Sequence, residues 1–176
     1  MSTVSELTAA VADAAVAHIV IAPGTYRFTG SMCGSSALCI DRDVTMEAAV
    51  ADTVELDAQG QRGVIYISAG LPKLINLEIK GGHRTNGGGV SIDGGLASFV
   101  GCTISSNSAE QSGGGVHFAG GSASFVGCNL SWNTANNGGG VHVAGDGSSA
   151  SFDDCTISRN TATQNGGGAL LADGTT

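Results

Sequence analysis

Apolar and polar residues alternate one by one over much of the chain, which is the pattern of half-buried β-strands. In one such stretch Ala123 and Phe125 alternate with serines, and Cys128 and Leu130 alternate with Asn129 and another serine. No segment of the later sequence has the 3.6-residue period of an amphipathic helix. The pattern therefore predicts short strands separated by glycine-rich or asparagine-containing corners.

The alternating pattern is itself repeated. Phe99, Phe125 and Phe152 are 26 and 27 residues apart. Three further sets keep this spacing: Cys102, Cys128 and Cys155; Ile104, Leu130 and Ile157; and Asn107, Asn133 and Asn160. Glycine triplets at 87–89, 113–115, 138–140 and 166–168 mark the successive copies. A fixed internal period of this length is the sequence signature of a repeat architecture.

Three strands in each copy of 25–28 residues, each with one inward face, form one coil of a parallel β-helix. Equivalent residues of successive coils then stack at the strand spacing of about 4.8 Å. We therefore expect continuous inward stacks of phenylalanine, cysteine and aliphatic side chains, and an amide ladder of the three asparagines in one corner. About six coils fit between Ile19 and Thr176.

The sequence predicts a single all-β domain over residues 1–176, with three parts. Residues 1–18 form a short helical cap, in which Thr3 and Glu6 make a capping box. Residues 19–86 form degenerate coils, and residues 87–176 form the regular repeats. We expect the helix to cover the first coil and to hide its open sheet edge.

The amino-acid composition and net charge limit the kinds of molecule that the protein could bind. Glycine contributes 29 residues, whereas charged residues make up only 12% of the chain. The net charge of −8 argues against nucleic acid, which requires a basic patch. No apolar run is long enough to span a membrane, and no signal peptide is visible at the start. The neutral faces, rich in serine and glycine, favour an extracellular or cell-surface location.

Several motifs resemble known β-helix families. The segments "HIVIAPGTYRF" and "VTMEAAVADTVELDAQGQ" resemble the opening of pectate-lyase-like right-handed β-helix proteins. The later "GGAL", "ISSNSA", "LSWNTA" and "ISRNTA" are similar to the GGA[ILV] and FxxN motifs of chlamydial polymorphic outer-membrane proteins. The whole chain also resembles β-helix repeat proteins of marine algae that have no assigned activity. The resemblance implies a right-handed β-helix, and the outer-membrane family implies surface display and adhesion.

The five cysteines fall into two groups. Cys33 and Cys39 flank a small loop outside the repeats, where they form either a disulfide or two buried free thiols. The three repeated cysteines would lie in line, one strand apart, which does not give the tetrahedral geometry of a zinc site. We expect them to act as small buried hydrophobic residues, so no metal and no cofactor is predicted.

Candidate binding residues lie in the rows that we expect to face outward. His117 and His142 would be neighbours on the first strand of successive coils, as a cation-binding pair or as two exposed polar residues. No acidic residue occupies their row, which favours the second interpretation. Trp132 and Arg159 take the same corner position within cation–π reach. They form either a platform for a sugar ring or a partner side chain, or a cover for an apolar corner.

The sequence gives little support for catalysis, because Asp153 and Asp154 lack a facing acid or base. We interpret the chain as a non-enzymatic β-solenoid scaffold or adhesive module. Its partner would be a protein or a glycan, with end-on contact through the C-terminal coil among the options. The alternative is a carbohydrate-active enzyme of the pectate-lyase-like class, and a third interpretation is ice binding by the row Thr103, Asn129 and Thr156.

Overall fold

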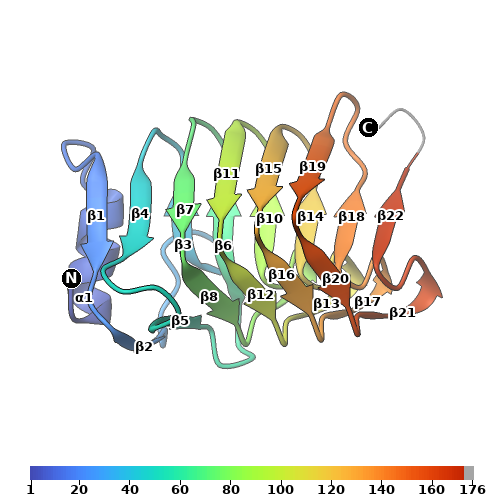
Figure 1. Ribbon diagram of the computed structural model, residues 1–176, viewed down its shortest axis with the longest axis horizontal. Coiled ribbons are helices and arrows are strands. Elements are labelled where there is room, and N and C mark those ends of the chain that lie inside the picture. Colours follow the sequence, from blue (N-terminus) through green and yellow to red (C-terminus); the bar gives the residue numbers. More distant parts are fainter. Residues whose placement is uncertain (173–176) are drawn as a thin grey trace.

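The computed structural model describes residues 1–172 and shows a stack of parallel coils with a helix at its N-terminal end (Figure 1). Successive coils contribute strands to three six-stranded parallel sheets, so that hydrogen bonds run from coil to coil. The predicted fold class, an all-β parallel β-helix of about six coils with a short N-terminal helix, is confirmed.

We name the sheets after side chains that they carry. The Phe sheet consists of β1 (His18–Ile21), β4 (Thr45–Ala48), β7 (Lys73–Ile75), β11 (Leu96–Val100), β15 (Ser122–Val126) and β19 (Ser149–Asp153). The Thr sheet consists of β2 (Gly24–Arg27), β5 (Val54–Asp57), β8 (Leu77–Lys80), β12 (Thr103–Ser105), β16 (Asn129–Ser131) and β20 (Thr156–Ser158). The His sheet consists of β3 (Ser36–Ile40), β6 (Gly63–Ile67), β10 (Val90–Ile92), β14 (Val116–Phe118), β18 (Val141–Val143) and β22 (Ala169–Leu171).

A fourth strand in the later coils departs from the expected three. It forms a four-stranded parallel sheet of β9 (His83–Asn86), β13 (Ser108–Ser112), β17 (Thr134–Asn137) and β21 (Thr161–Asn165). Its register shifts within each pair, which marks bulges. These segments are mostly polar, so hydrophobic alternation does not reveal them. Ala135 is their best-buried apolar residue, and it lies opposite Ala162 of the next coil.

The core consists of inward side chains stacked in register between coils. The rings of Phe99 and Phe125 stack with centroids 4.7 Å apart, and those of Phe125 and Phe152 stack at 4.9 Å. Leu74 continues this column towards the N-terminus and is fully buried. Stacking of this kind adds to the stabilisation that burial of large apolar side chains provides.

The N-terminal helix α1 (Val4–Ala12) covers the first coil, as expected. Thr3 and Glu6 form the predicted capping box. The apolar face of α1 buries Leu7 among the side chains of the core. Arg42 closes the other end of the helix, because one Nη atom donates hydrogen bonds of 3.1 and 3.2 Å to the carbonyls of residues 10 and 11. Within residues 1–172 no helix is long and apolar enough to cross a membrane.

Candidate functional site

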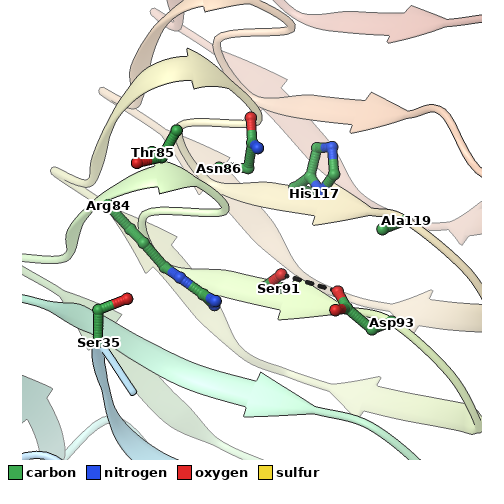
Figure 2. A pocket seen from close by; sticks show the side chains of 8 residues that line it. All are labelled: Ser35, Arg84, Thr85, Asn86, Ser91, Asp93, His117 and Ala119. Carbon is green, nitrogen blue, oxygen red and sulfur yellow. Dashed lines mark hydrogen bonds between the residues drawn. The ribbon is translucent and has the colours of Figure 1, made fainter.

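A polar groove of about 280 Å³ lies on the His sheet, where the early and the regular coils meet (Figure 2). The strand β10 runs along it, and β9 and β14 border it. The groove is lined by Ser35, Arg84, Thr85, Asn86, Ser91, Asp93, His117 and Ala119. Its lining therefore offers a cation, a carboxylate, an imidazole and several hydroxyl or amide groups.

Asp93 is held in place by two neighbouring side chains. The Tyr66 hydroxyl donates a hydrogen bond of 2.9 Å to one carboxylate oxygen, and Ser91 Oγ donates one of 3.2 Å to the other. The bond to the Asp93 carboxylate raises the pKa of Tyr66, so this hydroxyl remains a donor at neutral pH. Asp93 follows directly after β10 and lies at the end of the row rather than within it.

Arg84 brings a positive charge to the same groove. Its guanidinium lies over the Tyr66 ring, 5.2 Å from the ring centroid, and donates a 3.3 Å hydrogen bond to Ser36 Oγ. In the part of the chain that the structure describes, no ion pair joins Arg84 to a carboxylate. Figure 2 shows Arg84 and Asp93 on opposite sides of Ser91, so the two charges flank the floor of the groove.

The two histidines form a stacked pair, but they are not the exposed residues that the sequence suggested. Their rings stack with centroids 5.3 Å apart, and His117 is only 8% exposed. The glycine corner lies close to both residues, since a Cβ at Gly113 or Gly138 would lie 2.7 or 2.8 Å from the histidine Cβ beside it. Glycine thus lets the backbone of the corner approach the row closely.

Burial also sets the charge of these histidines. The pKa of His117 is lowered to about 4, mainly because the ring is shielded from solvent and secondly because His142 lies beside it. Burial also lowers the pKa of His142. Both rings are therefore neutral at pH 7. The Nδ1 atoms of both rings are buried without a hydrogen-bond partner among the described residues. Residues 1–172 contain no group of three or more His, Cys, Asp or Glu that could hold a metal ion.

Trp132 and Arg159 lie together at the corner after β16 and β20. The guanidinium of Arg159 lies 5.1 Å from the Trp132 ring centroid, and the tryptophan is 58% exposed. Both residues have positive φ, 58° and 55°, as has Ser106 at the same corner of the preceding coil. This left-handed conformation is uncommon for such side chains. It turns the chain sharply and leaves the indole and guanidinium on the surface as a small platform.

The five cysteines form one disulfide and a column of three free thiols. Cys33 and Cys39 are joined by a disulfide, with Cα atoms 6.0 Å apart. The three repeated cysteines are free thiols, and each donates a hydrogen bond to a carbonyl of the preceding coil, as Cys128 does to Phe99 at 3.5 Å. A hydrogen bond to Cys128, together with burial, raises the pKa of the Cys102 thiol.

The row proposed for ice binding and the acidic pair lie on open surface. Thr103, Asn129 and Thr156 stand opposite one another on β12, β16 and β20. Asp153 lies beside Val126 of the preceding coil, so no second carboxylate faces it there.

The asparagine ladder joins the regular coils through a repeated set of hydrogen bonds. The backbone N–H and Nδ2 of Asn107 both donate to Oδ1 of Asn133, each at 3.1 Å. Asn133 donates in the same way to Asn160, at 2.9 and 3.1 Å. Each side chain also donates from Nδ2 to a carbonyl of the preceding coil, as Asn133 does to Ile104 at 2.9 Å. The ladder is therefore directional.

Within residues 1–172, the side chains of the last coil are more exposed than those of the coils before it. Phe99 and Phe125 are completely buried, whereas Phe152 is 36% exposed although it continues the same stack. Ile157 of the same coil is also only partly buried. Figure 1 shows α1 against β1 at the opposite end of the rod.

The groove is the feature that the sequence did not disclose. His117 and His142 were expected as neighbours, and the register places Tyr66 and Ser91 in the same row with them. Arg84 and Asp93 were not expected beside that row. Arg84 belongs to strand β9, which the hydrophobic pattern did not reveal, and Asp93 belongs to the corner after β10. Their spacing of nine residues carries no periodic signal. The acidic residue two positions after Ser91 is the one indication in the sequence.

Comparison with known proteins agrees with the topology. The family model described as "Right handed beta helix region" matches residues 58–176, which is more than half of the chain. No curated protein and no solved structure shows a significant match. With the stacked parallel coils described above, the match shows that the chain belongs to the right-handed β-helix family.

Proposed function

We propose that this protein is a non-enzymatic β-solenoid scaffold that acts as a surface interaction module through its C-terminal coil. The observation that carries the proposal is the asymmetry between the two ends of the rod. The first coil lies under α1, whereas the last coil presents Phe152 and its outer backbone edge within the described residues. An uncovered edge of this kind is a template for pairing with another strand.

Two further features support an adhesive role at the cell surface. The exposed Trp132–Arg159 pair offers an aromatic and cationic platform of the type that binds partner side chains or sugar rings. The repeats also resemble those of polymorphic outer-membrane proteins, a family of surface-displayed adhesins. The platform lies at a corner of the repeated coils, so a scaffold can present it without an active site.

The end-on contact is tested by light scattering over a range of protein concentrations. The chain is compared with a version in which a designed helix, fused after Thr176, covers the last coil. We expect the original chain to associate as its concentration rises and the capped version to remain monomeric. A chain that stays strictly monomeric and is unchanged by the cap would contradict the proposal.

A second candidate, a carbohydrate-active enzyme, is favoured by the groove alone. There the Asp93 carboxylate, the Arg84 guanidinium and the neutral His117 imidazole line one cavity of a size suited to a sugar residue. Enzymatic activity predicts that reducing or unsaturated ends are released from polyuronates or other glycans, and that Asp93→Asn abolishes the release. Absence of any release by the unmodified chain across a broad glycan panel would exclude this candidate.

A further inference from the structure

We propose that the polar groove on the His sheet binds a small zwitterion, namely a free amino acid or a short peptide whose carboxylate and ammonium groups are a few bonds apart. In this arrangement the Arg84 guanidinium binds the carboxylate and the Asp93 carboxylate binds the ammonium group. The inference goes beyond the proposed scaffold function, because the groove lies on the side of the rod, among residues 35–119.

Arg84 is the positive end of the groove, and the protein does not neutralise its charge. The chain has 15 acidic residues against seven lysines and arginines, yet within residues 1–172 no carboxylate forms an ion pair with Arg84. Its side chain donates one hydrogen bond there, to Ser36 Oγ. An arginine carries five N–H donors in a planar fork that fits a carboxylate. Most of this fork is therefore open to an anionic group.

Neighbouring groups hold the arginine in this position. One face of its guanidinium lies over the Tyr66 ring. Gly63, which pairs with Ser36, leaves space for it, because a Cβ there would lie 3.1 Å from Arg84 Cδ and 3.2 Å from Ser36 Oγ. The φ of Gly63 lies outside the left-handed region, so these contacts, rather than the backbone conformation, require glycine. A side chain that is already ordered loses less conformational entropy when a ligand binds.

Asp93 is the negative end of the groove. It is exposed, and within the described part of the chain no lysine, arginine or histidine forms an ion pair with it. One carboxylate oxygen accepts from the Tyr66 hydroxyl and the other from Ser91 Oγ, which leaves lone pairs on both for a further donor. Tyr66 thus contacts both ends of the groove, with its ring under Arg84 and its hydroxyl on Asp93, and so fixes their separation.

The floor between the two charges is polar and uncharged. Figure 2 shows Ser91 between Arg84 and Asp93, with His117 on the next strand. Burial lowers the pKa of His117 to about 4, so its ring adds no positive charge at pH 7. A ligand with a carboxylate alone leaves Asp93 uncompensated, and sugar hydroxyls give it only the weaker kind of hydrogen bond, because an ammonium donor is itself charged. A ligand with both charges satisfies both ends.

Binding is measured by two-dimensional NMR of the isotope-labelled full chain, titrated separately with each standard L-amino acid and with glycylglycine. We expect at least one of these zwitterions to bind saturably and to shift the amide signals of residues 84–93 most. Its N-acetyl derivative, which lacks the ammonium charge, and its amide, which lacks the carboxylate, should each bind roughly tenfold more weakly or worse. The inference is wrong if no zwitterion binds, if the N-acetyl derivative binds equally well, or if galacturonate binds more tightly.

Two variants of similar shape assign the ends of the groove. Arg84→Gln removes the positive charge, and Asp93→Asn removes the negative charge but keeps an oxygen acceptor for Tyr66. We expect each to weaken the zwitterion roughly tenfold or more. Asp93→Asn should bind the N-acetyl derivative at least as well as the unmodified chain does, because the repulsion between two carboxylates is gone. Unchanged binding of the zwitterion by either variant would overturn the inference.

The control is Arg27→Gln, which removes an exposed arginine outside the groove and should bind like the unmodified chain. Melting temperatures, measured alongside, show whether a variant loses binding because it unfolds. The N-acetyl and amide derivatives test the unmodified chain, so they remain decisive if a variant does not fold. Light scattering of the end-on contact is independent of this groove, so the proposed function and this inference can fail separately.

Discussion

The early coils, residues 18–86, and the regular coils, residues 87–171, share one fold but are stabilised differently. In the early coils the inward column of the Phe sheet changes residue at each step, from Ile19 to Met46 to Leu74. In the regular coils the same column repeats phenylalanine, and an asparagine ladder and glycine triplets repeat beside it. The early coils add a disulfide and charge pairs on the outer face.

This difference shows that a β-helix requires apolar side chains of suitable size in its core, but not identical ones. Identical residues in successive coils form a stack or ladder, in which each side chain contacts the equivalent side chain of the coil before it and of the coil after it. A substitution in the regular coils should therefore disturb the coils on either side. A substitution on the outer face of the early coils should remain local.

The largest effect is expected for Phe125→Ala, which removes the middle ring of the phenylalanine stack. We expect the free energy of unfolding to fall by about 3–5 kcal/mol, because the cavity lies where the structure cannot collapse. Urea denaturation measures the change. Phe152→Ala is the control at the partly exposed end of the stack, and it should cost clearly less. Equal losses for the two variants would contradict the role given to the stack.

The next effect tests the ladder. Asn133→Leu leaves the two donors of Asn107 and the Ile104 carbonyl without partners in a buried corner. We expect a loss of about 3–4 kcal/mol, since each unsatisfied buried polar group costs about 1–3 kcal/mol. Asn129→Thr is the control, because Asn129 is exposed and its neighbours in the row are already threonines. If Asn133→Leu lowers the free energy of unfolding no more than the control does, water molecules satisfy these buried groups in place of the asparagine.

The stacks of the regular coils could be predicted from the sequence because they are periodic. Phenylalanine, cysteine and asparagine at a constant interval can occupy equivalent positions only if the coils stack, and the register follows from that interval. The fourth strand was missed for the converse reason. Its residues are polar, and its pairing depends on the backbone and on a few alanines such as Ala135.

The groove could not be predicted because it arises where the two kinds of coil meet. Arg84 belongs to the last early coil and Asp93 to the first regular one, so neither is repeated. The burial of His117 was also missed. An outward-facing position on a strand is normally exposed, but His117 is only 8% exposed, and the corner at Gly113 lies close to its Cβ.

Acidification should weaken the fold through this buried histidine pair. The pKa of His117 in the folded chain is about 4, below the ordinary value of 6.5, so the unfolded chain binds the proton more readily. Stability is therefore complete above pH 6.5 and should fall by about 3 kcal/mol as the pH drops to 4. The charged and titratable groups near the ring are His142, Asp93 and Arg84, and of these Asp93 opposes the shift.

The measurement is urea denaturation at a series of pH values between 7 and 4. The variant His117→Gln removes the titrating group, so its stability should vary much less over this range. If the unmodified chain and the variant lose stability in parallel as the pH falls, the effect arises elsewhere and the neutral buried histidine is not its source.

The smallest effect is expected on the outer face of the early coils, where Lys80 lies between two carboxylates. Its Nζ is 2.9 Å from Glu55 and 3.8 Å from Glu78, and the bond to Glu55 raises the pKa of the lysine. These side chains remain in contact with water, so Lys80→Met should cost less than about 1 kcal/mol. High salt should reduce the difference further, because it screens exposed charges. A loss as large as that of Asn133→Leu would mean that charge pairs stabilise the early coils as strongly as the ladder stabilises the regular ones.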